Sequence, residues 1–169
     1  LGRMYAQRLT EALGQNFLAD ANTAHRIARL AGVAPGDRVL EIGPGVGSLT
    51  VALLAAGARV TALELDQHVI PALEETVGPD AIRIVVGDAL RVDLDELLGS
   101  APVGAGAEDG EVADGPWGMV SNLPYNVATP IVMRFLEDAT EVPSNLGVGQ
   151  PEVGGGMATG PGTQDYGAV

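Results

Sequence analysis

Short apolar runs alternate with stretches of helical periodicity along most of the chain. Strands are predicted where consecutive residues are mostly apolar and often β-branched. These runs lie at residues 39–42, 58–65, 82–86 and 117–121. Around them, apolar side chains recur every three or four positions, which indicates helices with one buried face. The helical stretches lie at residues 22–31, 48–56, 67–77 and 130–136.

Capping residues set the predicted limits of the first and last of these helices. Asp20 or Asn22 is suited to cap the first helix, and Gly32 is suited to end it. Thr129 is predicted to cap the last helix, with Pro130 at its first position. Proline fits there because the N–H that it lacks has no helical partner at that position.

The alternation of strands and helices predicts a doubly wound α/β domain, in which helices cover both faces of a parallel sheet. Residues 1–144 are assigned to this domain. Residues 145–169 are rich in glycine and contain no Arg or Lys, so we expect a weakly ordered tail, a remnant of the later strands. The last part of the sheet is then missing or eroded. Residues 99–115 are predicted to form a flexible acidic loop.

The loop after the first predicted strand is rich in glycine. Residues 39–47 read V-L-E-I-G-P-G-V-G, so Gly43, Gly45 and Gly47 lie between a strand and a helix. Glycines let the backbone turn tightly and approach a ligand, and the helix start offers free N–H donors. The spacing is G-x-G-x-G rather than the G-x-G-x-x-G of dinucleotide sites. Such a loop also occurs as an ordinary tight turn.

Acidic residues accompany the ends of three successive predicted strands. Glu41 lies just before the glycine loop, Glu64 ends the second strand and Asp88 follows the third. Ligands of parallel sheets bind at the carboxyl ends of the strands, so these side chains are expected at one site. A carboxylate beside the loop repels a pyrophosphate but suits a cation. This favours S-adenosylmethionine, with its ammonium and sulfonium groups, over a nicotinamide cofactor, and Glu64 is suited to bind its ribose.

The fourth predicted strand leads into Asn122-Leu123-Pro124-Tyr125. The exocyclic amine of adenine is a poor nucleophile because its lone pair is conjugated with the ring. The side-chain carbonyl of Asn122 and the main-chain carbonyl of Leu123, oriented by Pro124, can accept hydrogen bonds from that amine and stabilise the charge that develops on methylation. Tyr125 can stack on a flipped-out base. Alternatively, this stretch is a plain strand end that turns into a helix, with Tyr125 in the core.

Composition and charge narrow the remaining classes of function. The 169 residues contain no cysteine, and His25 and His68 have no partner at metal-binding spacing, so we expect no metal site. No apolar run is long enough to cross a membrane, and we expect a cytoplasmic protein. Nine basic residues stand against 22 acidic ones, a net charge of −13. This balance predicts no obvious basic face for a nucleic acid.

Four stretches, taken in order, resemble the ribosomal RNA adenine dimethyltransferases. They are L-G-Q-N-F-L at residues 13–18, E-I-G-P-G-V-G at 41–47, the strand ends at Glu64 and Asp88, and N-L-P-Y-N-V-A-T-P at 122–130. The resemblance covers residues 13–136 and implies a Rossmann-like methyltransferase sheet. It also implies transfer of methyl groups from S-adenosylmethionine to two adjacent adenines of small-subunit ribosomal RNA. The expected partner is this RNA or a pre-ribosomal particle, bound by a monomer.

The resemblance also implies roles for individual residues. Asp88 would face the adenine of the methyl donor, Glu64 its ribose, and residues 122–125 the target base. Glu41, just before the glycine loop, and Gly45 within the loop are also expected at the donor site. The family's small helical, RNA-contacting domain is expected to be absent. The residues implied at the donor site are Asn16, Leu18, Gly43, Glu64, Asp88 and Asn122.

Two alternatives remain open at the level of sequence. One is a large-subunit ribosomal RNA adenine methyltransferase that confers antibiotic resistance, which shares the Asn-Pro-Tyr chemistry; Thr129-Pro130 favours the small-subunit enzymes instead. The other is a non-catalytic ribosome-assembly or RNA-binding factor of the same fold. The acidic composition supports this second alternative, whereas Asn122, Pro124 and Tyr125 argue against it.

Overall fold

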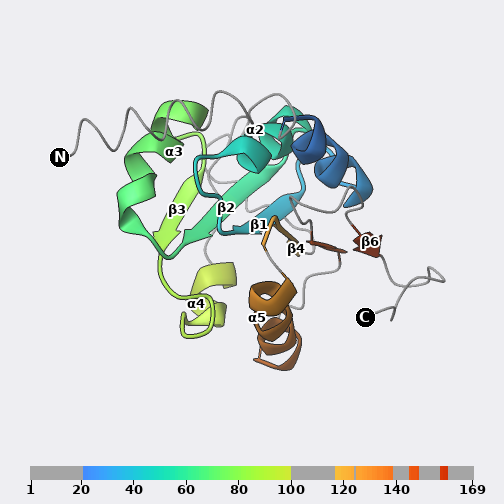
Figure 1. The fold of residues 1–169 in the computed structure, drawn as a ribbon, viewed down its shortest axis with the longest axis vertical. Helices are drawn as coiled ribbons and strands as arrows, with labels where there is room; N and C mark the ends of the chain where they lie inside the picture. The colour runs from blue at the N-terminus through green and yellow to red at the C-terminus, as the bar shows by residue number, and fades with distance from the viewer. Residues whose placement is uncertain (1–20, 100–116, 124, 139–144, 149–156, 160–169) are drawn as a thin grey trace.

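The computed structural model of the protein describes residues 21–99, 117–123, 125–138, 145–148 and 157–159 (Figure 1). Strands and helices alternate through most of these residues. The strands are β1 (Arg38–Ile42), β2 (Arg59–Glu64), β3 (Arg83–Val86), β4 (Trp117–Ser121), β5 (Asn145–Val148) and β6 (Met157–Thr159). The helices are an N-terminal helix at residues 21–30, α2 (Ser48–Ala55), the 3-10 turn η1 (Gln67–Val69), α3 (Ile70–Val77), α4 (Leu94–Gly99) and α5 (Tyr125–Asp138).

The strands form one sheet in the order β3-β2-β1-β4-β5-β6. All neighbours are parallel except β5 and β6, which are antiparallel. The chain moves from β1 through β2 to β3 on one side and then continues with β4 on the other side of β1. The strand order therefore reverses between β1 and β4, which is where doubly wound sheets bind their ligands. Ile42 pairs with Ser121 there, so the segments that follow the two strands start side by side.

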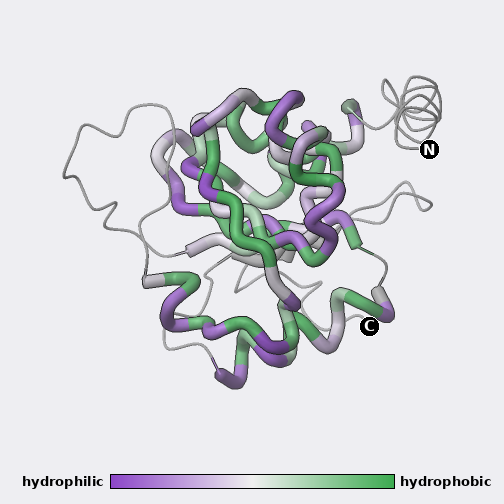
Figure 2. Tube along the Cα trace, turned by 90° about the vertical axis from the view of Figure 1, so that its left-hand side faces the viewer, coloured by the Kyte–Doolittle hydropathy of each residue, from purple (hydrophilic) through white to green (hydrophobic). Residues whose placement is uncertain are grey.

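Apolar side chains of the strands form a core on each face of the sheet. Figure 2 shows hydrophobic and hydrophilic residues interspersed along the chain. In β1, Val39 belongs to the first core and Leu40 to the second. The N-terminal helix, α2 and α3 cover the first face, whereas α4 and α5 cover the second (Figure 1). The predicted doubly wound α/β architecture is therefore confirmed. Buried strands of this kind are near-continuous apolar runs because both faces are covered.

Three helices differ from the sequence prediction. Asn22 does not cap the N-terminal helix, because residues 21–30 are helical, and Asp20 lies outside the described residues. Thr129 does not cap α5, because the helix begins four residues earlier at Tyr125 and holds Pro130 in its interior. Proline at this position loses one main-chain hydrogen bond. Packing of Ile131 and Phe135 in the second core offsets that loss. The short helix α4 was not predicted, although Asp93 accepts a hydrogen bond from Glu96 N at 3.0 Å, which is a typical helix-capping contact.

Two short strands lie inside the segment 145–169, for which a weakly ordered remnant of the later strands is predicted. Strand β5 pairs with β4, and β6 pairs with β5. The weak order of the rest of this segment stays a prediction. Glycine-rich residues are poor strand formers in isolation, but the edge of an existing sheet supplies main-chain partners whatever the side chains. The boundary at residue 144 stays a prediction, and the acidic loop falls largely on residues 100–116, outside the described part.

Candidate active site

Main-chain hydrogen bonds join the carboxyl ends of β1, β2 and β3. The N–H of Gly43 donates to the carbonyl of Leu63 at 2.9 Å, and the N–H of Gly87 donates to the carbonyl of Glu64 at 2.8 Å. These contacts extend the sheet by one residue beyond the strands. The predicted glycine loop and the acidic strand ends at Glu64 and Asp88 therefore lie along one edge.

The glycine loop has a backbone conformation that side chains disfavour. Gly43, Gly45 and Gly47 have φ of +67°, +56° and +95°. This left-handed region costs other L-residues about 1–2 kcal/mol each. Gly47 is the N-cap of α2, and no side chain among the described residues caps that helix start. The first N–H groups of α2 therefore remain available to a ligand.

Glu64 is 8% exposed and holds the glycine loop through its carboxylate. One oxygen accepts a hydrogen bond from Gly45 N at 3.1 Å, and the other accepts one from Asp66 N at 2.9 Å. A carboxylate can accept more than these two bonds. Glu64 thus fixes the loop and retains lone pairs for a ligand at the same edge.

Glu41 lies beneath the loop and is only 1% exposed. Its carboxyl group accepts a hydrogen bond from the hydroxyl of Thr50 on α2, at 2.7 Å. Burial raises the pKa of Glu41 from 4.5 to about 7; the Thr50 hydrogen bond opposes the rise, and the negative charge of Glu64 adds to it. Glu41 is therefore part of the support of the loop rather than part of its exposed surface.

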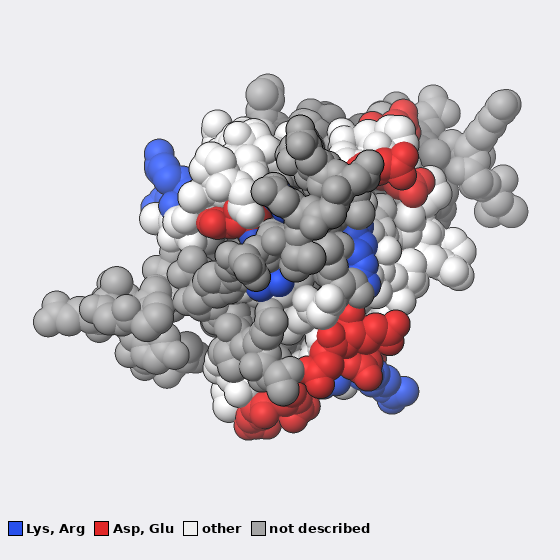
Figure 3. All heavy atoms as spheres, turned by 180° about the vertical axis from the view of Figure 1, so that it is seen from behind, with Lys and Arg blue, Asp and Glu red and all other residues white. Residues whose placement is uncertain are grey.

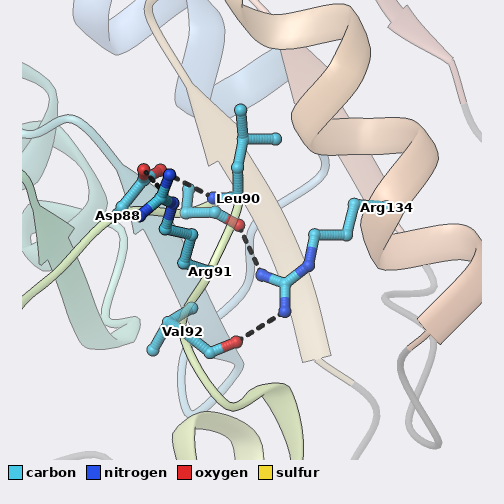
Figure 4. A network of polar contacts seen from close by, with 6 residues as sticks. Asp88, Leu90, Arg91, Val92 and Arg134 are labelled. Carbon is cyan, nitrogen blue, oxygen red and sulfur yellow. Dashed lines mark hydrogen bonds and ion pairs between the residues drawn. The ribbon is translucent and has the colours of Figure 1, made fainter.

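Asp88 organises the turn that follows β3 (Figure 4). Its side chain accepts a hydrogen bond from Leu90 N at 2.9 Å, and its main-chain carbonyl accepts bonds from Arg91 N and Val92 N. The Arg91 guanidinium lies 3.7 Å from the second carboxylate oxygen. The side chain of Asp88 is 40% exposed, so one edge of the carboxylate still faces solvent.

Asn122 follows β4 on the other side of the point where the strand order reverses. Its side-chain carbonyl oxygen is buried, and no donor among the described residues bonds to it. A buried polar atom without a partner costs about 1–3 kcal/mol, so native structures leave few of them. Such an atom at a ligand-binding edge is suited to accept a hydrogen bond from a ligand.

Leu123 brings the two predicted motifs into contact. A Cβ atom built on Gly43 would lie 2.8 Å from Cδ2 of Leu123, so the leucine packs directly against the first glycine of the loop. This contact explains why Gly43 has no side chain, in addition to its positive φ. The segment that carries Asn122 and the loop expected to hold the donor are therefore packed against each other.

Replacing Gly43 by alanine should lower the free energy of unfolding by about 2 kcal/mol, because the left-handed strain is joined by displacement of Leu123. Gly45→Ala is the matched control. Gly45 has a similar φ, but no atom of the other described residues lies within 4 Å of its built Cβ, so we expect a loss of about 1 kcal/mol. Urea denaturation of both variants measures the difference. Equal losses would show that the contact with Leu123 carries no cost.

Four of the predicted site residues fall where the structure gives no description of the side chain. Asn16, Leu18 and Pro124 lie outside the described residues, and only the helical backbone of Tyr125 is described. Within the described ranges, no group of three or more His, Cys, Asp or Glu side chains is arranged to hold a metal ion. None of the helices in those ranges is long and apolar enough to cross a membrane.

Three residues near this edge were missed in the sequence. Leu65 and Leu90 are 70% and 47% exposed and lie one and two residues beyond Glu64 and Asp88. Arg134 reaches the turn after β3 from α5 (Figure 4). The sequence offered a signal for the two leucines, since each lies within two residues of a predicted ligand of the donor. Arg134 had none, because its partners are more than 40 positions away in the sequence.

Acidic side chains are concentrated at one edge of the described part of the molecule. Acidic side chains gather along the lower edge of the molecule in Figure 3, where α4 and α5 lie. The exposed acidic residues of these two helices are Asp95, Glu96, Glu137 and Asp138. This edge is therefore unsuited to bind a polyanion such as RNA.

The fold and the site define a Rossmann-like methyltransferase domain, with a glycine loop and acidic strand ends at the point where the strand order reverses. Within that class, the chain belongs to the ribosomal RNA adenine dimethylase family, whose model matches residues 6–168. The family resemblance inferred from the four sequence stretches is confirmed.

Individual relatives agree with this assignment. The chain is 45% identical over 157 residues to the ribosomal RNA small subunit methyltransferase A of Moorella thermoacetica. The aligned residues make up 92% of this chain and 53% of the relative. The crystal structure of the 23S rRNA methyltransferase ErmE is 29% identical, with a TM-score of 0.54 over 75% of this chain and 44% of that one. A structure described as an S-adenosyl-L-methionine-dependent methyltransferase from Methanococcus maripaludis has a TM-score of 0.58 at 21% identity, covering 86% and 62% of the two chains, and at this identity the likeness concerns the fold alone. The chain spans about half the length of the curated relatives it matches.

Proposed function

We propose that this chain carries the catalytic site of an S-adenosylmethionine-dependent enzyme that dimethylates the exocyclic amines of adjacent adenines in small-subunit ribosomal RNA. The observation that carries the proposal is the buried side-chain carbonyl oxygen of Asn122, which has no hydrogen-bond partner among the described residues and whose neighbour Leu123 packs on the glycine loop. An oxygen of this kind is already desolvated, so it pays little when it accepts a hydrogen bond from the target amine. Membership of the family supports the choice of adenine as the target.

The donor is proposed to bind across the carboxyl ends of β1, β2 and β3. Glu64 would accept hydrogen bonds from the ribose hydroxyls, and Asp88 one from the adenine amine. Leu65 and Leu90 are exposed beside these two carboxylates and would cover the faces of the adenine ring. Gly43 and Gly45 allow the methionine part to approach the backbone.

Glu41 is proposed to act on the donor through its charge rather than by contact, because its side chain is 1% exposed. Glu64 is close enough to Glu41 for its negative charge to raise the pKa of the Glu41 carboxyl group. Two carboxylates under and beside the loop give a negative potential that suits a sulfonium and an ammonium group. Bringing a cationic donor into this field should favour the ionised form of Glu41.

Methyl transfer then depends mainly on position. The carbonyl oxygens of Asn122 and Leu123 would draw the amine of the flipped adenine into line with the donor methyl group and stabilise the positive charge on nitrogen. The new N–C bond would form as the S–C bond of the donor breaks, with S-adenosylhomocysteine as the leaving group. The methylated amine is acidic, so it would release its proton to water, and no strong general base is required. Tyr125 would stack on the base. The substrate is proposed to be the RNA or a pre-ribosomal particle, bound in the cytoplasm by a monomer.

Calorimetric titration with S-adenosylmethionine and S-adenosylhomocysteine tests the donor site, and methyl transfer to small-subunit RNA or a partly assembled small-subunit particle tests the reaction. Saturable donor binding and methylated adenines are expected. Binding without transfer to either substrate would favour a non-catalytic factor. Transfer to large-subunit RNA alone would favour the activity named for ErmE. A folded chain that binds neither ligand would refute the proposed site.

Replacing Glu64 by glutamine should raise the Kd for S-adenosylmethionine about tenfold, because a charge-assisted hydrogen bond contributes about 1.5 kcal/mol or more. Glutamine keeps the shape of the side chain but can accept only one of the two bonds from Gly45 and Asp66, because its NH2 group is a donor. Glu74→Gln, on the exposed surface of α3, removes the same charge away from the site and should leave the Kd unchanged. An unchanged Kd in the Glu64 variant would place the ribose elsewhere.

A further inference from the structure

Arg134 joins helix α5 to the turn that follows β3. One guanidinium nitrogen donates to the carbonyl of Ala89 and another to the carbonyl of Val92, both at 2.7 Å (Figure 4). Its side chain is only 20% exposed. Both are short hydrogen bonds from a charged donor, a strong class of protein hydrogen bond. The planar guanidinium can serve two carbonyls at once, which a lysine cannot do in the same geometry.

The turn that Arg134 holds is the one organised by Asp88. The Asp88 side chain and main-chain carbonyl accept the N–H groups of Leu90, Arg91 and Val92 from inside the turn. Arg134 binds the carbonyl groups of the same turn from outside. The turn thus has its N–H groups satisfied by its own aspartate and two of its carbonyls satisfied by another element.

Helix α5 is also the helix that starts three residues after Asn122. Its residues Ile131 and Phe135 pack in the second core together with Ala89 of the turn and Leu94 of α4. The apolar contacts hold α5 against this part of the sheet, and the two hydrogen bonds of Arg134 fix where the turn lies along it. A contact that is only structural would not have to lie between these two particular segments.

We propose that Arg134 is a positioning residue that holds the Asp88 turn in register with the Asn122 segment, so that the donor site and the amine-binding site are assembled as one unit. This rests on the proposed function, in which Asp88 binds the donor adenine. The ion pair of Arg134 with Asp138, at 3.5 Å, leaves that carboxylate 60% exposed and contributes little by comparison. The role of Arg134 is to order the turn, not to touch the donor.

The test combines donor binding with hydrogen exchange on the full chain. Arg134→Met keeps the apolar stem and removes both hydrogen bonds, and Arg134→Lys keeps the charge but has a single donating nitrogen in place of two. The methionine variant should raise the Kd for S-adenosylhomocysteine about tenfold and increase exchange at the amides of Leu90, Arg91 and Val92 by a similar factor. The lysine variant should recover part of both losses.

Arg83→Met is the matched control. Arg83 also donates to a main-chain carbonyl, that of Leu97 in α4 at 2.9 Å, but away from the Asp88 turn. It should lower thermal stability without changing the Kd or the exchange of the three amides. If Arg134→Met is folded and matches the wild type in both the Kd and the exchange, the positioning role is refuted. If the wild type binds no donor, the proposed function fails, and the exchange data alone decide whether Arg134 orders the turn.

Discussion

Replacing Asn122 by alanine is expected to lower the rate of methyl transfer by at least 10²–10³-fold while the Kd for S-adenosylmethionine changes little. Removing a preorganised hydrogen-bonding group that acts on the transition state typically costs a factor of this size. The side-chain oxygen of Asn122 is the buried acceptor that would stabilise the developing charge on the target amine. Single-turnover transfer to a small-subunit particle, together with calorimetric donor binding, separates the two quantities.

The same variant should be at least as stable as the wild type. Asparagine at this position leaves a buried oxygen without a partner among the described residues, and alanine removes that oxygen. Loss of activity with unchanged or increased stability would be the signature of an atom kept for catalysis. Asn126→Ala is the matched control, since Asn126 is exposed on the first turn of α5, and should leave the rate near that of the wild type. An active Asn122 variant would refute the assigned role.

Replacing Glu41 by glutamine is expected to change how the stability of the protein depends on pH. Burial raises the pKa of Glu41 from 4.5 to about 7. Between these two values the folded protein keeps the proton that the unfolded chain releases, so the stability of the wild type falls as pH rises. The contribution of Glu41 to the free energy of unfolding is fully present below pH 4.5 and is lost above about pH 7. This loss amounts to about 3 kcal/mol.

Glutamine cannot ionise, so the variant should gain about 3 kcal/mol relative to the wild type between pH 4.5 and pH 8. Urea denaturation across this range measures the gain. Thr50→Val removes the hydroxyl whose hydrogen bond lowers the pKa of Glu41 and should move the midpoint of the change to higher pH. Parallel stability curves for the wild type and the glutamine variant would show that Glu41 has the same pKa in the folded and unfolded chain.

Sequence patterns located the elements of the donor site because the signals there are local. Glycines that must adopt positive φ, as Gly43 and Gly45 do, are visible in the sequence regardless of the rest of the fold. Apolar runs predicted β1 to β4 because a strand covered on both faces is apolar throughout. The predicted start of α5 was wrong, since the packing of its buried residues overrode the helix-start signal of Thr129-Pro130.

The sequence by itself therefore determined the doubly wound class, the glycine loop, and the presence of Glu64, Asp88 and Asn122 at strand ends. Only the tertiary structure decided how these parts meet. Leu123 packs on Gly43, Thr50 bonds to the buried Glu41, and Arg134 holds a turn 42–45 positions earlier in the chain. Such contacts join segments that are distant in sequence, and their geometry follows from the packing of helices on the sheet, which no local pattern encodes.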